Sequence, residues 1–319
     1  MPTDSIISRD DAGALIPEDA ASEILGTMPE QSAVMQLAKR LPDMSRKQRR
    51  LPVWQSLPTA YFVNGDTGLK QTSNMSWQNV YLNAEELAVI VPIPDNVADD
   101  VDYNIRDQAR PYIVEAVGAA FDQAVIYGIN APDVWPEHLV EQCDNAGHVV
   151  ALGDNGDLYD DLLGEGGVLS LIEEDGFMPN GHVAALTMKA KMRGLRDQEG
   201  QPIFRSSGEQ GTKMSYSLDG ESLVFPRNGS IDPSRSLLIS GDWDQLVFAV
   251  RQDITWKFLD QAVIQDSEGA IVYNLAQQDM TALRLVFRVG WALPNPLNRV
   301  NEDDETRFPF AYLEPQNAS

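Results

Sequence analysis

Residues 92–128 read PIPDNVADDVDYNIRDQARPYIVEAVGAAFDQAVIYG, and this stretch decides the fold. An extended apolar run breaks at an Asp-rich turn and gives way to a long helix, predicted over 102–128. Asp102 is the expected N-cap, and Gly128 supplies the stop. The predicted buried face repeats every three or four residues and consists of Ile105, Ala109, Ile113, Ala116, Ala120, Phe121, Ala124 and Gly128.

Pro111 lies inside this predicted helix. It removes one backbone hydrogen bond and its ring crowds the preceding turn, but the apolar period resumes in phase after it. We therefore predict that the helix continues through Pro111 with a bend at that point. Pro111 is the candidate hinge of the molecule.

The composition excludes several classes of protein. The net charge is −24, from 48 acidic and 24 basic residues, so the molecule as a whole repels nucleic acid and should not recognise a DNA sequence. Acidity that only keeps an abundant protein soluble is an alternative explanation of this charge. No apolar run approaches the roughly 20 residues of a membrane helix, and the first residues do not resemble a secretion signal. The single cysteine excludes an internal disulfide framework and favours a reducing compartment.

The segments before the helix are not expected to fold alone. Residues 1–50 predict an arm with two short amphipathic pieces, around 18–25 and 31–41. Residues 51–92 predict a long two-stranded hairpin with a turn-rich tip, NGDTGLKQTSNM, at 64–75. Because a two-stranded ribbon is marginally stable in water, both segments should lie on another subunit.

The remainder of the chain predicts two units of an α+β fold. The first contains the long helix and covers 93–165, and the second, over 166–250, alternates helices and strands. Residues 251–319 alternate at period two, most clearly in MTALRLVFRVGWALP at 280–294, and should return to the sheet beside the long helix. The first unit is therefore predicted to be discontinuous in sequence.

No sequence motif indicates catalysis. His138, His148 and His182 lack metal-ligand spacing, and Cys143 has no second cysteine beside it. The Gly-rich segment 164–170 lacks the Lys-Ser/Thr ending of a phosphate-binding loop, and a GxSxG motif is absent. We predict no catalytic residue, no cofactor and no metal site.

An acidic loop is the remaining candidate site. Its carboxylates are Asp154, Asp157, Asp160, Asp161 and Glu165. Glu165 is twelfth counting from Asp154, as in a calcium loop, but Tyr159 occupies the sixth position, where glycine is required. A solvated loop is expected, with weak divalent-ion binding and a soluble carboxylate-dependent enzyme as alternatives.

Taken in order, these segments resemble the major capsid proteins of tailed bacteriophages of the Hong Kong 97 type. GALIPEDAASEIL looks like the N-arm of that family, LPVWQ to IVPIP like its E-loop, and the Asp-rich turn with its helix like the spine helix of its P-domain. GHVAALTMKAKMRGLRD resembles the strand and helix of its A-domain, and LRLVFRVGWALPNP its final sheet segment. The order and spacing of these weak patterns carry the resemblance.

The resemblance implies a structural protein and not an enzyme. Hexamers and pentamers would form an icosahedral head around double-stranded DNA, and the prohead would expand into a mature shell. The implied partners are further copies of the chain, a separate scaffolding protein and a portal, with a decoration protein as a further candidate and no membrane. Assembly would take place in the host bacterial cytoplasm and the product would be a virion. An encapsulin-type nanocompartment is the alternative with the same fold.

Contacts between subunits are predicted in the arm and the hairpin. A quarter of the basic residues lie within 39–50, and they should meet acidic groups of a neighbouring copy. A solvated basic face and contact with enclosed DNA are the alternatives. The predicted contact residues are Arg46, Lys47, Arg49, Arg50, Asp66, Lys70 and Trp77.

The resemblance also bears on covalent crosslinking. The founding member of the family joins subunits through a Lys to Asn isopeptide bond assisted by a Glu. Lys70 lies in the corresponding loop, but Asp279 stands at the Asn position and Val286 at the Glu position. No autocatalytic crosslinking is predicted.

Overall fold

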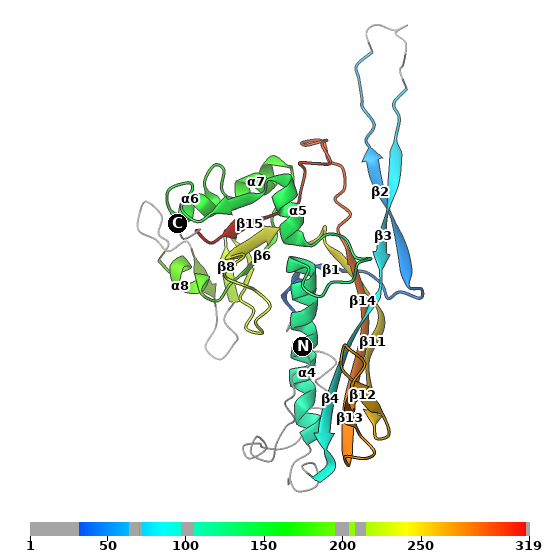
Figure 1. Ribbon diagram of the computed structural model, residues 1–319. Helices are drawn as coiled ribbons and strands as arrows, with labels where there is room; N and C mark the ends of the chain where they lie inside the picture. The colour runs from blue at the N-terminus through cyan, green and yellow to red at the C-terminus, as the bar shows by residue number, and fades with distance from the viewer. Residues whose placement is uncertain are drawn as a thin grey trace.

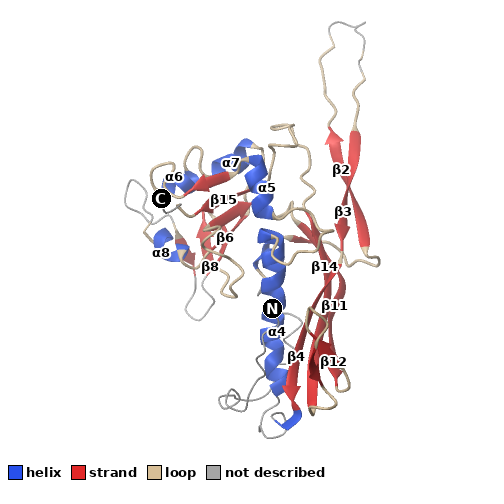
Figure 2. Cartoon of the chain, viewed as in Figure 1, coloured by secondary structure: helices blue, strands red, loops and turns tan. Residues whose placement is uncertain are grey.

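A computed structural model describes residues 32–63, 70, 72–96, 105–194, 204–207 and 215–316 of the chain. For residues 105–108, 205–207 and 215 only the backbone is described. The expected N-cap Asp102, the amphipathic piece at 18–25 and Asp66 lie outside the described residues. The chain forms a long sheet with a helix along it, a second mixed subdomain beside the end of that helix, and a projecting hairpin (Figures 1 and 2).

The long helix α4 (Ile105–Tyr127) lies along a four-stranded sheet. The strand order is β1 (Lys39–Arg40), β11 (Val247–Leu259), β14 (Met280–Ala292) and β4 (Glu85–Pro94). β14 is antiparallel to both β11 and β4, whereas β1 is parallel to β11. A short hairpin of β12 (Val263–Gln265) and β13 (Ile271–Asn274) follows β11. The return of the C-terminal region to this sheet is confirmed.

The buried face of α4 differs from the predicted one. Ile113, Val114, Val117 and Phe121 are buried in the core that α4 shares with β14, whereas Ala116 is exposed. The prediction of Ala116 as a core residue is therefore wrong, because its small side chain gives no signal that places it on either side of the helix. Branched and aromatic side chains bury more apolar area, and they fix the rotation of the helix against the sheet.

The end of α4 is confirmed at Gly128. Its φ is 70°, a left-handed conformation that glycine adopts without strain, and its N–H donates to Ala124 O at 3.1 Å. An added Cβ would lie 2.3 Å from His138 Cδ2. Pro111 lies within the uninterrupted helix, so the prediction that the helix continues through it is confirmed. The bend remains a prediction.

The hairpin is shorter than predicted and ends at residue 83. β2 (Gln48–Ser56) pairs with β3 (Ser76–Asn83), but β4, which follows after Ala84, pairs with β14 over its whole length. The prediction of one hairpin strand reaching residue 92 is therefore wrong. Apolar alternation is present on both sides of Ala84 but changes phase across Glu85 and Glu86, and the pairing partner separates the two strands.

The second subdomain is built on a seven-stranded sheet. Its strand order is β5 (Val149–Ala151), β15 (Phe310–Glu314), β10 (Leu238–Gly241), β6 (Gly181–Ala184), β9 (Glu221–Val224), β8 (Ser215–Leu218) and β7 (Arg205–Ser207). Its helices are α5 (Leu139–Ala146), α6 (Leu158–Leu163), α7 (Val168–Glu174) and α8 (Met188–Met192). β5 pairs with β15, so this unit begins before the predicted division at residue 165. α8 ends at Met192. No helix in the described ranges is long and apolar enough to cross a membrane.

Candidate functional site

The projecting hairpin carries large apolar side chains that the chain itself does not cover. Trp54 and Trp77 face each other across β2 and β3, with ring centroids 6.0 Å apart in an edge-to-face arrangement. Trp54 is 45% exposed and Trp77 is 64% exposed, while Phe62, farther toward the tip, is fully exposed. Further exposed apolar residues of the hairpin are Tyr61, Val63, Met75 and Tyr81. Several exposed large apolar side chains on one projecting element indicate an interaction site.

The base of the hairpin is held firmly where it crosses the long sheet. Leu82 is fully buried there in a small core with Met44 and Ala249. At Gly290 an added Cβ would lie 2.4 Å from Asn83 O, so the crossing requires glycine at this position. Trp135 Nε1 also donates to Asn83 O at 3.0 Å. The hairpin therefore projects from a fixed base.

The basic residues beside the hairpin divide into two groups. Lys47 Nζ lies 2.7 Å from Glu85 Oε1, and Arg49 donates to the carbonyl oxygens of Pro42 at 2.6 Å and Asp43 at 3.0 Å. These two side chains therefore contact their own chain, a role that the charge pattern did not reveal. Their contact with a neighbouring copy remains a prediction.

The other predicted contact residues that the structure describes are exposed. Arg46 and Arg50 are exposed and have no recorded partner among the described residues. Lys70 is exposed near the hairpin tip, and Trp77 belongs to the aromatic pair. Trp77 and Arg50 lie on the same hairpin, and their contact with a neighbouring copy remains a prediction.

The acidic loop uses its carboxylates to organise its own backbone. Asp157 caps α6 by accepting from Tyr159 N at 2.8 Å and Asp160 N at 3.1 Å. Asp161 is fully buried and accepts from Gly153 N at 2.7 Å and Asn155 N at 2.9 Å. Within the described ranges, no group of three His, Cys, Asp or Glu residues is placed to hold a metal ion. These contacts give the loop a structural role.

A buried carboxylate that the sequence analysis missed anchors the arm to the long helix. Asp122 on α4 accepts from Ser32 Oγ at 2.6 Å, Ala33 N at 2.9 Å and Val34 N at 3.1 Å. It thus caps α2 (Ala33–Leu37) from another helix. Burial raises the pKa of Asp122 to about 6, and the hydrogen bonds oppose that rise. The only sequence signal was an acidic residue within an otherwise apolar helical face.

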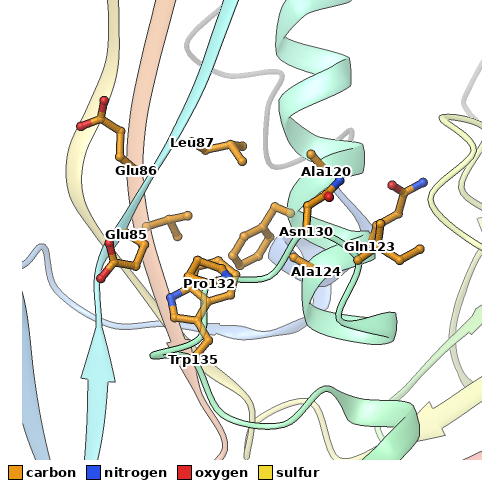
Figure 3. A pocket seen from close by; sticks show the side chains of 12 residues that line it. Glu85, Glu86, Leu87, Ala120, Gln123, Ala124, Asn130, Pro132 and Trp135 are labelled. Carbon is orange, nitrogen blue, oxygen red and sulfur yellow. The ribbon is translucent and has the colours of Figure 1, made fainter. Parts of the chain in front are cut away.

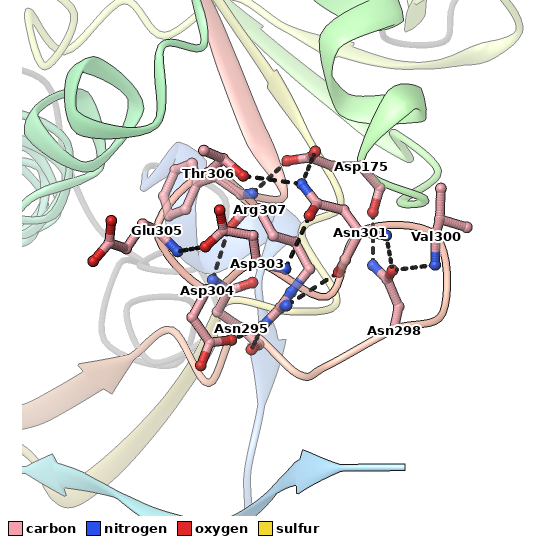
Figure 4. A network of polar contacts seen from close by, with 11 residues as sticks. Asp175, Asn295, Asn298, Val300, Asn301, Asp303, Asp304, Glu305, Thr306 and Arg307 are labelled. Atoms are coloured by element: carbon pink, nitrogen blue, oxygen red, sulfur yellow. Dashed lines mark hydrogen bonds and ion pairs between the residues drawn. The ribbon is translucent and has the colours of Figure 1, made fainter. Parts of the chain in front are cut away.

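The loop between β14 and β15 holds a network of polar contacts (Figure 4). Asp175 accepts from Asn301 Nδ2 and Phe308 N, each at 2.7 Å, and fixes the loop to the second subdomain. The buried Arg307 donates to Asn301 O at 3.1 Å inside the loop. On the opposite side, Arg299 Nη2 donates to Pro58 O of the hairpin at 2.7 Å. The loop therefore links parts of the chain that are far apart in sequence.

The histidines and the cysteine have structural surroundings. His148 lies 3.2 Å from Asp175 through Nε2, and its Nδ1 is 2.9 Å from Phe310 O. Burial lowers the pKa of His182 to about 4, and its Nδ1 lies 2.8 Å from Ser240 Oγ. Burial raises the pKa of the Cys143 thiol well above its ordinary value, so the thiolate is disfavoured.

A small pocket lies between the C-terminal half of α4, β4 and the loop before α5 (Figure 3). Phe121, Leu87 and Trp135 form much of its apolar wall, and Glu85 and Glu86 lie at its edge. Its volume is about 80 Å³, below the roughly 300 Å³ at which ordinary cofactor and substrate pockets begin. This pocket is too small for such a ligand.

The arrangement of a spine helix on a long sheet, a second subdomain and a projecting hairpin agrees with comparisons with known proteins. The model of the phage capsid family matches residues 12–297. The chain belongs to the phage capsid family. It is therefore a phage major capsid protein, a structural protein of the virion whose relatives assemble as oligomers in the capsid.

Individual phage capsid proteins and structures support this assignment. The chain is 25% identical to the major capsid protein of Staphylococcus phage 80alpha over 290 residues, covering 90% of this chain and 84% of that protein. A solved chain of Microbacterium phage Oxtober96 matches with a TM-score of 0.76 and 30% identity, covering 98% of this capsid protein and 100% of that chain. A solved chain of Mycobacterium phage Cain matches with a TM-score of 0.76 and 31% identity, covering 99% of this capsid protein and 100% of that chain. The Hong Kong 97-like α+β fold is therefore confirmed.

Proposed function

We propose that this capsid protein forms the hexamers and pentamers of an icosahedral head that encloses double-stranded DNA, and that its hairpin lies over a neighbouring subunit. The exposed apolar surface of the hairpin is the observation that supports this proposal. A two-stranded ribbon gains little stability by itself, and several uncovered aromatic side chains on it would be a liability in a free monomer. Burial of such aromatic residues typically supplies much of the binding free energy of an interface.

The same geometry supports a transition from prohead to expanded shell. One face of the seven-stranded sheet has a core of its own, while Val183, Ile239 and Phe310 on the other face share the core of α4 and the long sheet. The second subdomain can therefore tilt against that shared core, and the hairpin can bend beyond its fixed base. Pro111 is the proposed bend in the long helix, because the backbone hydrogen bond missing there lowers the cost of bending. A scaffolding protein, a portal and a decoration protein are the proposed partners of the head.

Electron microscopy of the expressed chain, alone and together with its scaffolding protein, tests the proposed function. We expect closed icosahedral shells. Particles from infected cells should contain DNA, whereas cargo protein in their place would indicate the encapsulin-type alternative. A chain that remains a monomer or dimer in gel filtration under all these conditions would contradict the proposal.

We also predict that the shell lacks covalent links between subunits. An isopeptide bond of the family type forms when a lysine amine attacks an asparagine amide with release of ammonia. The residue at that position is the exposed Asp279, whose carboxylate offers no comparable leaving group, and Val286 cannot act as a base. Assembled particles boiled in detergent should run as single chains on a denaturing gel. A ladder of covalent oligomers would show that the prediction is wrong.

A further inference from the structure

The outer face of the long sheet holds a groove lined with basic side chains, which we call the basic groove. Its volume is about 410 Å³. Leu283, Leu285 and Phe287 of β14 face α4 and are buried, so the residues between them point to the opposite side of the sheet. The polar residues lining the groove are Glu86, Gln252, Thr255, Lys257, Arg284 and Arg288.

Two cations of the basic groove lie directly opposite each other. Lys257 on β11 and Arg284 on β14 are partners in the antiparallel pairing. Like charges in directly opposite positions destabilise a sheet. Within the described residues neither side chain has a recorded carboxylate partner, and Arg284 Nε is buried without any hydrogen-bond partner. The isolated subunit therefore leaves an unfavourable charge arrangement that an external anion would relieve.

The far end of the basic groove shows how a carboxylate fits it. Arg288 binds Glu86 Oε2 through Nε at 3.0 Å and Nη2 at 2.8 Å. Glu86 belongs to β4, the edge strand, and is the one carboxylate that lines the groove. Arg284 pairs with Ile90 of β4, and Ile90 is 44% exposed. A carboxylate at this end must therefore come from outside the sheet.

The charge of the whole chain indicates where that carboxylate comes from. Each copy has a net charge of −24, so copies repel one another, and a cation that meets a carboxylate of the next copy reduces this repulsion. We propose that the basic groove is a contact surface between subunits, in which acidic side chains of a second copy bind Lys257 and Arg284. This inference rests on the proposed assembly and adds a polar contact surface to the apolar hairpin.

Charge reversal in the groove provides the first test. Subunits with Lys257→Glu and Arg284→Glu should remain folded, because that pair makes no recorded contact with a carboxylate of its own chain. The assembled fraction, measured by sedimentation velocity, should fall by at least about tenfold. The variant Lys257→Arg with Arg284→Lys retains both charges and should assemble normally. The exposed pair Lys191 and Arg227 on the second subdomain, each changed to Glu, controls for net charge and should also assemble.

The thermal stability of the isolated subunit distinguishes a role of Lys257 in folding from a role in contact between subunits. Lys257→Thr removes the repulsion between the two cations, so the thermal midpoint of the isolated subunit should stay the same or rise while assembly weakens. A residue needed only for folding would lower both. Normal assembly of the double charge-reversal variant would overturn the proposal.

Zero-length carbodiimide crosslinking of shells made from mixed isotope-labelled and unlabelled subunits identifies the partner. We expect Lys257 joined to an acidic peptide of a different copy. Crosslinks of Lys257 only within one copy, or only to another protein, would overturn the proposal. Loss of the crosslink between copies after nuclease treatment would also overturn it, because the groove would then bind DNA phosphates. If wild-type subunits and both control variants form no shells, the proposed function fails. Failure of the charge-reversal variant alone supports the groove.

Discussion

Subunits in which Phe62 and Trp77 are both changed to serine are expected to fold but to form no closed shells. Trp77 loses its edge-to-face contact with Trp54, which costs about 0.5 to 1.5 kcal/mol within the hairpin. Phe62 is fully exposed, so its replacement should hardly change the stability of the isolated chain. At an interface, however, a buried aromatic anchor typically contributes about 2 to 4 kcal/mol, and every subunit of a shell would lose both residues.

Electron microscopy and sedimentation of the purified variant measure this effect, with circular dichroism as the check on folding. The conservative variant Phe62→Tyr with Trp77→Phe retains most of the apolar area and should assemble. Closed particles of normal size from the serine variant would show that the hairpin surface is not needed between subunits. Loss of the folded signal would instead assign Trp77 to stability of the chain.

Changing Asp122 to alanine should destabilise the subunit by about 3 kcal/mol, because three buried donors lose their acceptor. The donors are Ser32 Oγ, Ala33 N and Val34 N, so α2 should detach from α4 first. Denaturant unfolding gives the free energy, and hydrogen exchange in α2 gives the local opening. Asp157 is the matched control, since it also caps a helix but is exposed; Asp157→Ala should cost only about 1 kcal/mol.

The pH dependence of the Asp122→Ala effect has a defined sign. The pKa of Asp122 is raised from 3.8 to about 6 in the folded chain, chiefly by burial. Its folded state therefore holds a proton more tightly than its unfolded state, and the stability linked to that proton is present below pH 4 and lost as the pH rises through 6. Alanine does not titrate, so the cost of the substitution should be larger at pH 4.5 than at pH 7.5 by about 2 kcal/mol. A cost that shrinks on acidification would contradict this account.

The order of the elements could be predicted because it depends on local backbone geometry. The helical period in residues 105–127, the left-handed stop at Gly128 and the alternation in β14 each follow from steric limits that act within a few residues. The exposed Ala116 and the early end of the hairpin were missed. The exposure of Ala116 depends on which face of the helix packs against the sheet, and the end of the hairpin depends on the pairing of β4 with β14. Neighbours in sequence specify neither.

The candidate contact surfaces were predicted only in part. The sequence placed Trp77 and Arg50 in a segment that cannot stand alone, and the structure leaves both exposed. It also grouped Arg49 with them, although the guanidinium of Arg49 binds two carbonyl groups of its own chain. Charge patterns identify a basic segment, but only the packed structure distinguishes a cation with an internal partner from one without.

The sequence by itself determined the succession of arm, hairpin, spine helix and mixed subdomain, because periodicity, capping and turn residues act locally. Tertiary structure decided the rest. It separated β3 from β4 through pairing with β14, and it buried Asp122 beneath the start of α2. It also set Lys257 opposite Arg284. Each of these depends on contacts between residues far apart in the chain, whose distances are fixed only when the sheet and the helix pack together.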